Sequence, residues 1–165
     1  MKLNNYLLLA SLGAVIQAAQ FRLKITSSTN STLDGRYLVP LDEGDNFYVG
    51  YALEKHNAVN YCLDNGRLVW TDKDASALIT EMGSEYNTFF QFNTTDGAQT
   101  SDEFSFTDDN KLMFDNISGK FLACDDYQLS DYLPVQHGQP AVINYYPTGP
   151  GHDLCHPISI EKEDC

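Results

Sequence analysis

The sequence predicts an all-β protein, a single antiparallel β-sandwich of short strands and hairpins. Short apolar runs alternate with turns rich in Asn, Asp and Gly, which is typical of such folds. Ten Tyr and nine Phe supply enough apolar surface for a core. The turn pattern Asp/Asn-Gly-Arg recurs at unequal spacing, so a three-fold β-trefoil is the alternative rather than the first choice.

The first 19 residues resemble a secretory signal peptide. Lys2 gives a basic start, residues 6–16 form a short apolar run, and Ala18-Ala19 offers small residues for cleavage. The apolar run is too short and too interrupted to span a bilayer. We therefore expect a signal peptide over 1–19, one β domain over 20–165, and a soluble protein that is secreted to the extracellular space or the cell wall.

Alternating or continuous apolar residues mark the strands of the first half. The run Phe21-Arg22-Leu23-Lys24-Ile25 alternates as a half-buried strand should. Asp64-Asn65-Gly66 favours a tight hairpin, because Asn-Gly adopts positive φ easily. The strands expected here are 21–25, 36–39, 47–51, 60–63 and 67–70.

The second half predicts more short strands. Thr88-Phe89-Phe90-Gln91-Phe92 is rich in residues that favour strands. Between Phe104 and Cys124, three apolar strands are separated by two polar turns. The full expected set is 78–82, 88–92, the three strands within 104–124, 141–146 and 158–160.

The charge and composition exclude several function classes. The formal net charge is −13, and the predicted leader contains one lysine and no acid. Such a chain would repel nucleic-acid phosphates and anionic membrane surfaces. Hydrophobic residues make up 42% of the chain, which argues against disorder.

Four cysteines lie in the predicted exported part. Because exported proteins meet an oxidising compartment, an even number of cysteines predicts two disulfides. The sequence leaves all three connectivities open. The residues concerned are Cys62, Cys124, Cys155 and Cys165.

Three Asn-x-Ser/Thr sequons are candidate N-glycosylation sites. They begin at Asn30, Asn93 and Asn116, each in or beside a polar stretch next to a predicted strand. We expect about two of the three to carry a glycan.

The acidic residues do not form a persuasive catalytic or cation site. Asp125 and Asp126 are the most clustered carboxylates, and a small wall glycoside hydrolase is the enzymatic alternative. Neighbouring residues of an extended chain point in opposite directions, which disfavours an acid–nucleophile pair. The acidic turn at 42–46 has suitable oxygens for calcium but lacks the spacing of a known loop.

Histidine chemistry is equally weak. His152, Asp153 and His156 flank Cys155, but Gly151 and Pro157 disfavour the helix that would bring the two imidazoles together. We expect no catalytic residue, no metal and no cofactor.

Exposed aromatic rings are the remaining candidate for ligand contact. Trp70, Tyr145 and Tyr146 are candidate carbohydrate contacts if they share an exposed face. The alternative is that the aromatic residues fill the core. The wider aromatic set also includes Tyr48, Tyr51, Tyr127 and Tyr132.

Two passages resemble a known family. The hairpin at 61–68 and the segment 104–124, which ends in Phe121-Leu122-Ala123-Cys124, are similar to the fungal phialide-type cell-wall protein (PhiA-like) family. Residues 150–155 resemble the Gly-rich turn and Asp-Cys that follow in that family. Pir-type cell-wall mannoproteins share a more distant likeness.

The resemblance implies a non-enzymatic, glycosylated protein of the fungal wall, linked in its relatives to conidium-forming structures and stress protection. Its partners would be wall polysaccharide or other wall proteins. Cys124 and Cys155 match family positions, whereas Cys62 and Cys165 have no clear counterpart. A carbohydrate-binding secreted module or effector is the alternative function.

Overall fold

The fold is taken from a computed structural model, which describes residues 19–27, 29–44, 47–81, 88–94, 100–118, 121–124, 142–145 and 155–165. The predicted leader lies outside the described residues, apart from Ala19. So do Tyr127, Tyr132, Tyr146, the acidic pair Asp125-Asp126 and the pair His152-Asp153.

Short antiparallel strands make up the described chain, together with one 3-10 turn, η1 (Lys55–Asn57). The strands are β1 (Phe21–Thr26), β2 (Tyr37–Asp42), β3 (Phe47–Leu53), β4 (Tyr61–Asp64), β5 (Arg67–Trp70), β6 (Ala75–Glu81), β7 (Thr88–Asn93), β8 (Phe104–Phe106), β9 (Leu112–Phe114), β10 (Ile117–Ser118), β11 (Phe121–Cys124), β12 (Val142–Tyr145) and β13 (Cys155–Asp164).

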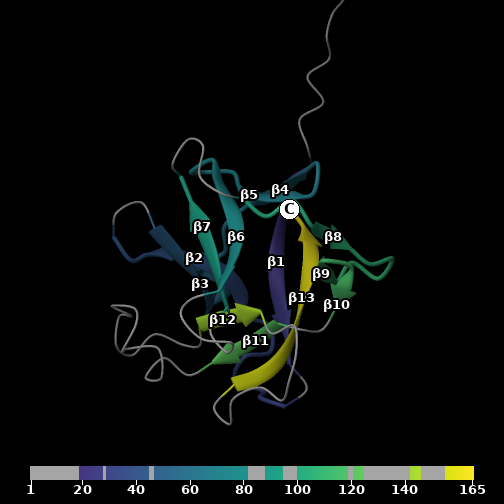
Figure 1. The fold of residues 1–165 in the computed structure, drawn as a ribbon. Coiled ribbons are helices and arrows are strands. Elements are labelled where there is room, and N and C mark those ends of the chain that lie inside the picture. The colour runs from purple at the N-terminus through teal and green to yellow at the C-terminus, as the bar shows by residue number, and fades with distance from the viewer. Residues whose placement is uncertain are drawn as a thin grey trace, which may run out of the picture.

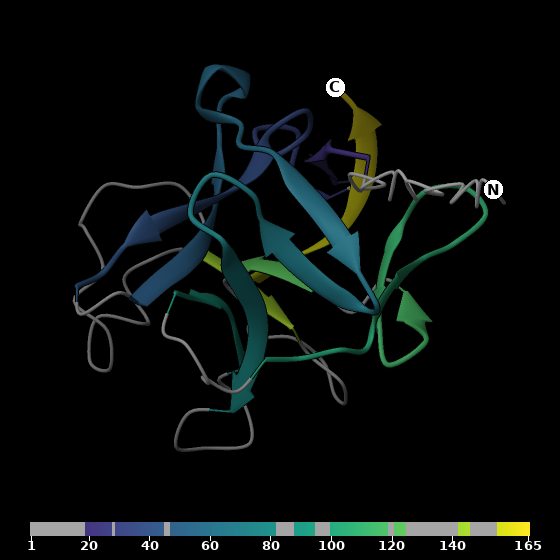
Figure 2. The ribbon, with the colours of Figure 1, turned by 90° about the horizontal axis from the view of Figure 1, so that it is seen from above.

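Seven strands close into an antiparallel barrel. The ladder runs β1-β2-β3-β7-β6-β5-β4 and returns to β1 through the pair Phe21↔Tyr61. Seen from above, these strands curve around a common interior (Figure 2). The seam between β1 and β4 rests on that single register pair.

The remaining strands extend the barrel on one side. β1 pairs along its whole length with the C-terminal part of β13, from Phe21↔Asp164 to Thr26↔Ser159. β11 lies between β13 and β12, and β12 reaches back to β3 and β7. A small sheet of β8, β9 and β10 lies beside β1 and β13 (Figure 1).

Aromatic side chains fill the interior. In β1 the alternation of the sequence places Phe21, Leu23 and Ile25 inside, none more than 3% exposed. The Phe90 ring lies 5.5–5.9 Å from the rings of three other phenylalanines, the contact distance of packed aromatics. The barrel interior is therefore a packed core.

The predicted Asn-Gly hairpin forms between β4 and β5. Asn65 and Gly66 both have positive φ, 48° and 84°. A Cβ on Gly66 would collide with the Asp102 carbonyl, and the Gly66 carbonyl accepts the Phe104 N–H at 2.9 Å. The glycine thus allows the hairpin tip to pack against the approach to β8.

The predicted all-β class is confirmed, but the predicted two-sheet sandwich is not what the strand pairing gives. β1 and β3 each pair with two different strands along one edge, so the sheet branches and closes instead of splitting into facing layers. The trefoil alternative does not describe this ring either, because seven strands cannot be divided among three equal repeats.

Candidate functional site

A polar hollow of about 410 Å³ opens where β1 ends beside β13. Three hydroxyl groups, two carboxylates and one ammonium group line it, over an apolar floor. The lining residues are Thr26, Ser27, Asp34, Lys111, Pro157, Ile158, Ser159 and Glu161.

The walls of the hollow follow from the β1–β13 register. Thr26 lies opposite Ser159, and the Thr26 hydroxyl donates to Glu161 Oε1 at 3.2 Å. The Ser27 hydroxyl donates to the Pro157 carbonyl at 3.3 Å. Because Ile158 is 3% exposed, its side chain belongs to the core beneath.

Lys111 brings the small sheet to the same hollow. Its backbone forms an isolated bridge with Glu161, and its Nζ lies 2.8 Å from Asp109 Oδ2. The hydrogen bond with Asp109 raises the pKa of Lys111, and the bonds from Lys111 and Thr107 lower the pKa of Asp109. The pair is exposed, so it contributes little to stability.

The lining offers both donors and acceptors of hydrogen bonds. Its hydroxyl and ammonium groups donate, and the hydroxyls and the carboxylates of Asp34 and Glu161 accept. The lining residues include no histidine and no cysteine. Groups of this kind can hydrogen-bond a polar ligand.

The aromatic candidates lie in the core. Trp70, expected as an exposed platform, is 8% exposed and meets Tyr48 edge-on at 5.3 Å. Tyr145 is 4% exposed and packs against Phe114 and Phe121. The described aromatic candidates therefore do not form an open sugar-stacking face, and Tyr146 lies outside the described residues.

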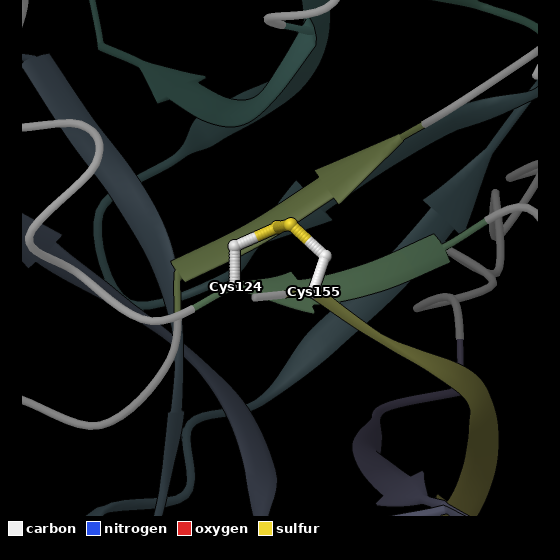
Figure 3. Close-up of a disulfide and its surroundings, with 2 residues drawn as sticks. All are labelled: Cys124 and Cys155. Carbon is white, nitrogen blue, oxygen red and sulfur yellow. A yellow bond between two sulfur atoms is a disulfide. The ribbon is translucent and has the colours of Figure 1, made fainter. Parts of the chain in front are cut away.

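A disulfide joins Cys124, at the end of β11, to Cys155, at the start of β13 (Figure 3). The two residues are direct partners in the β11–β13 register. The bridge closes the excursion that contains β12, because 31 positions separate the two cysteines. This is the pair that the family resemblance singled out.

Cys62 and Cys165 are free thiols in the structure, so the predicted second disulfide is not formed there. Cys62 is half-buried in β4 and Cys165 is exposed beyond β13. Burial, with Asp64 and Asp74 nearby, raises the pKa of the Cys62 thiol. Two acids, Asp64 and Asp74, and one base, Arg67, act on Cys62, which is the reverse of the electropositive surroundings that make a cysteine reactive.

The three sequons have different settings. Asn116 is exposed in the β9–β10 turn with φ 57°. Asn30 lies in a loop, where its Oδ1 accepts the Thr32 hydroxyl at 2.7 Å. Asn93 instead lies within β7, half-buried and in register with Phe47 on one side and Ser76 on the other.

No group of three or more His, Cys, Asp and Glu side chains suited to a metal occurs among the described residues. Asp42 and Glu43 of the acidic turn are engaged elsewhere, with Gly44 N–H at 2.8 Å and the Tyr51 hydroxyl at 2.7 Å. Asp45 and Asn46 lie outside the described residues. The described part also contains no helix long and apolar enough to cross a membrane.

Sequence reasoning missed the hollow, since its residues are spread from Thr26 to Glu161 and no motif links them. The long-range pairing of β1 with β13 creates the hollow.

Comparison with protein-family models, curated proteins and solved structures gave no match.

Proposed function

We propose that this protein is a secreted, non-enzymatic glycoprotein that associates with the fungal cell wall through its outer surface. The observation that carries the proposal is the Cys124–Cys155 disulfide. Such bonds persist in oxidising compartments and are rare in the cytosol. The leader-like start of the sequence independently supports export.

The packed interior supports a role for the surface. The largest fully buried side chains of the main core include Tyr61, Phe90 and Phe92, which occupy the space that a ligand-binding barrel would leave open. A partner would therefore meet the outside of the barrel. Wall polysaccharide or another wall protein fits that mode of contact.

Two sequons lie outside the regular strands. Asn116 is exposed in a turn, where a glycan would point to solvent, and Asn30 is half-buried in a loop, with its Oδ1 bonded to the Thr32 hydroxyl. Glycans would add to the polar surface of an acidic protein and keep it soluble outside the cell. A link to conidium formation and stress protection rests on the family resemblance.

Fractionation of a fungal culture tests the proposal. The full chain, carrying a C-terminal epitope, is expressed beside a matched variant that lacks residues 1–19. We expect the full chain in the medium or the wall fraction, and the shortened chain in the cytosol. Recovery of the full chain from the cytosol alone, with its leader intact, would contradict the proposal.

The polar hollow favours a second candidate, a carbohydrate-binding module. Its hydroxyls and carboxylates resemble the groups that hydrogen-bond sugars, although an exposed aromatic ring is missing from its lining. Titration with soluble β-glucan and chitin oligosaccharides, followed by NMR, tests this candidate. Binding should move the signals of Thr26 and Ser159 and fall in Glu161→Gln, with Asp72→Asn in an exposed turn as control. An absence of shifts would remove it.

A further inference from the structure

The two free cysteines flank the first strand at the barrel seam. Phe21 of β1 pairs with Tyr61 of β4 and also with Asp164 of β13, antiparallel in both cases. One step further along each antiparallel ladder, Cys62 and Cys165 both fall beside Gln20. The two cysteines thus stand on opposite sides of the same residue.

Both cysteine side chains belong to the outer face. Phe21 and Tyr61 are 3% and 0% exposed and point into the core. Because side chains alternate along a strand, Cys62 points outward. On β13 the buried side chains of Ile158 and Ile160 point inward. Cys165 is an odd number of positions from both, so the same alternation turns its side chain to the outer face.

The Cys165 thiol already reaches across β1. Its Sγ lies 3.3 Å from Asn60 Oδ1. Asn60 and Cys62 are two positions apart, which places their side chains on one side of an extended chain. Figure 1 shows the C-terminal end of β13 beside β4.

The remaining gap is small. Strands two places apart in a sheet are separated by about 10 Å, whereas bridged cysteines have Cα atoms within about 7 Å. Residue 165 would have to shift by about 3 Å. It lies outside the ladder, because β13 ends at Asp164, and it is exposed. The shift therefore breaks no strand pairing.

We propose that Cys62 and Cys165 form a second disulfide, here called the clasp, which crosses β1 and locks the barrel seam. A covalent link would reinforce the seam, where one register pair joins β1 to β4. The clasp would tie β4 to β13, the strands on either side of β1. It would enclose the Cys124–Cys155 loop within a larger one.

Formation of the clasp requires a disulfide oxidant of the secretory pathway, such as oxidised glutathione. The Cys165 thiolate attacks the oxidant, forms a mixed disulfide and releases one glutathione thiolate. The Cys62 thiolate then attacks the Cys165 sulfur, and the second glutathione leaves. Two thiols lose two protons and two electrons, and one glutathione disulfide becomes two thiols. The raised pKa of Cys62 predicts that the second step accelerates with rising pH.

Peptide mapping without reduction tests the clasp directly. The full chain is secreted from a eukaryotic host, alkylated with iodoacetamide and digested. We expect one linked pair of peptides containing Cys62 and Cys165, separate from the Cys124–Cys155 pair. Alkylation of both Cys62 and Cys165 in this preparation would overturn the proposal.

Variants separate the clasp from a bridge between two copies. On a non-reducing gel the wild type should run as a monomer, and a dimer that Cys165→Ser abolishes would overturn the proposal. Wild type should also melt about 5–10 °C above both Cys165→Ser and the double variant Cys62→Ser/Cys165→Ser. Equal melting temperatures for all three would show that no clasp acts on the fold.

Discussion

Removal of the Cys124–Cys155 bridge should lower the free energy of unfolding by about 3–4 kcal/mol. The bridge closes a loop with a sequence separation of 31. Loop-closure entropy for about 31 residues gives ~3.7 kcal/mol at 25 °C. Cys124 is 4% exposed, so alanine is the appropriate replacement because serine would bury a hydroxyl.

The comparison is made in a Cys62→Ser/Cys165→Ser background, so that only one bridge is varied. The assay is urea unfolding followed by far-UV circular dichroism. With an m-value of about 2 kcal/mol/M, the midpoint of the Cys124→Ala/Cys155→Ala variant should fall by about 2 M.

A reductant supplies the control for this measurement. Dithiothreitol should lower the midpoint of the background protein towards that of the variant and leave the variant unchanged. A difference below about 1 kcal/mol would refute the reasoning, because the loop would then be held equally well by the β11–β13 and β11–β12 pairings alone.

Four further outcomes are expected. Tyr61→Phe should cost about 1–2 kcal/mol in urea unfolding, because the buried Leu38 carbonyl loses its 3.0 Å hydrogen bond; an unchanged midpoint would contradict this. Trp70→Ala should cost about 3–5 kcal/mol through a core cavity, while Trp70→Phe costs less; a fully stable alanine variant would show that the ring is not in the core. Mass spectrometry of the secreted protein should find glycans at Asn30 and Asn116 and none at Asn93, and full occupancy of Asn93 would refute the placement. The Tyr37 hydroxyl donates to Glu163 at 2.7 Å and lowers the pKa of that carboxyl. The stabilisation from this bond is therefore present above the usual pKa of 4.5 and is lost as acid protonates Glu163. Tyr37→Phe should flatten the fall of stability between about pH 5 and pH 3, and an unaltered pH profile would count against the bond.

Local features of the fold were predictable from short stretches of sequence. The Asp64-Asn65-Gly66 hairpin forms as expected, because the turn requires positive φ and Asn and Gly adopt positive φ more easily than other residues. Strands predicted at 21–25 and 88–92 differ from β1 and β7 by one residue at one end. Their alternating or aromatic sequence is enough to define them.

Barrel closure was not predictable, because it depends on contacts between distant segments. Hydrophobic periodicity shows which residues of β1 point inward, but not that Phe21 meets Tyr61. β13 was predicted only over 158–160, whereas it spans Cys155–Asp164. Its polar ends read as loop, although pairing with β1 and β11 holds them extended.

The candidate sites divide in the same way, into those that a short stretch of sequence can indicate and those that depend on contacts between distant segments. The Cys124–Cys155 pair was anticipated from the resemblance, while the hollow needed the β1–β13 register. Trp70 was misplaced because a tryptophan at the end of a hairpin looks exposed when only its neighbours Thr71 and Asp72 are considered. In the fold its ring packs against Tyr48 of β3.

The identity of the mature secreted chain tests the central claim most directly. Intact-mass and N-terminal analysis of the protein from medium and wall fractions should give a glycosylated chain that starts near residue 20 and has a Cys124–Cys155 bridge. An unglycosylated chain that keeps its first 19 residues, with both thiols reduced and found only in the cytosol, would contradict the account.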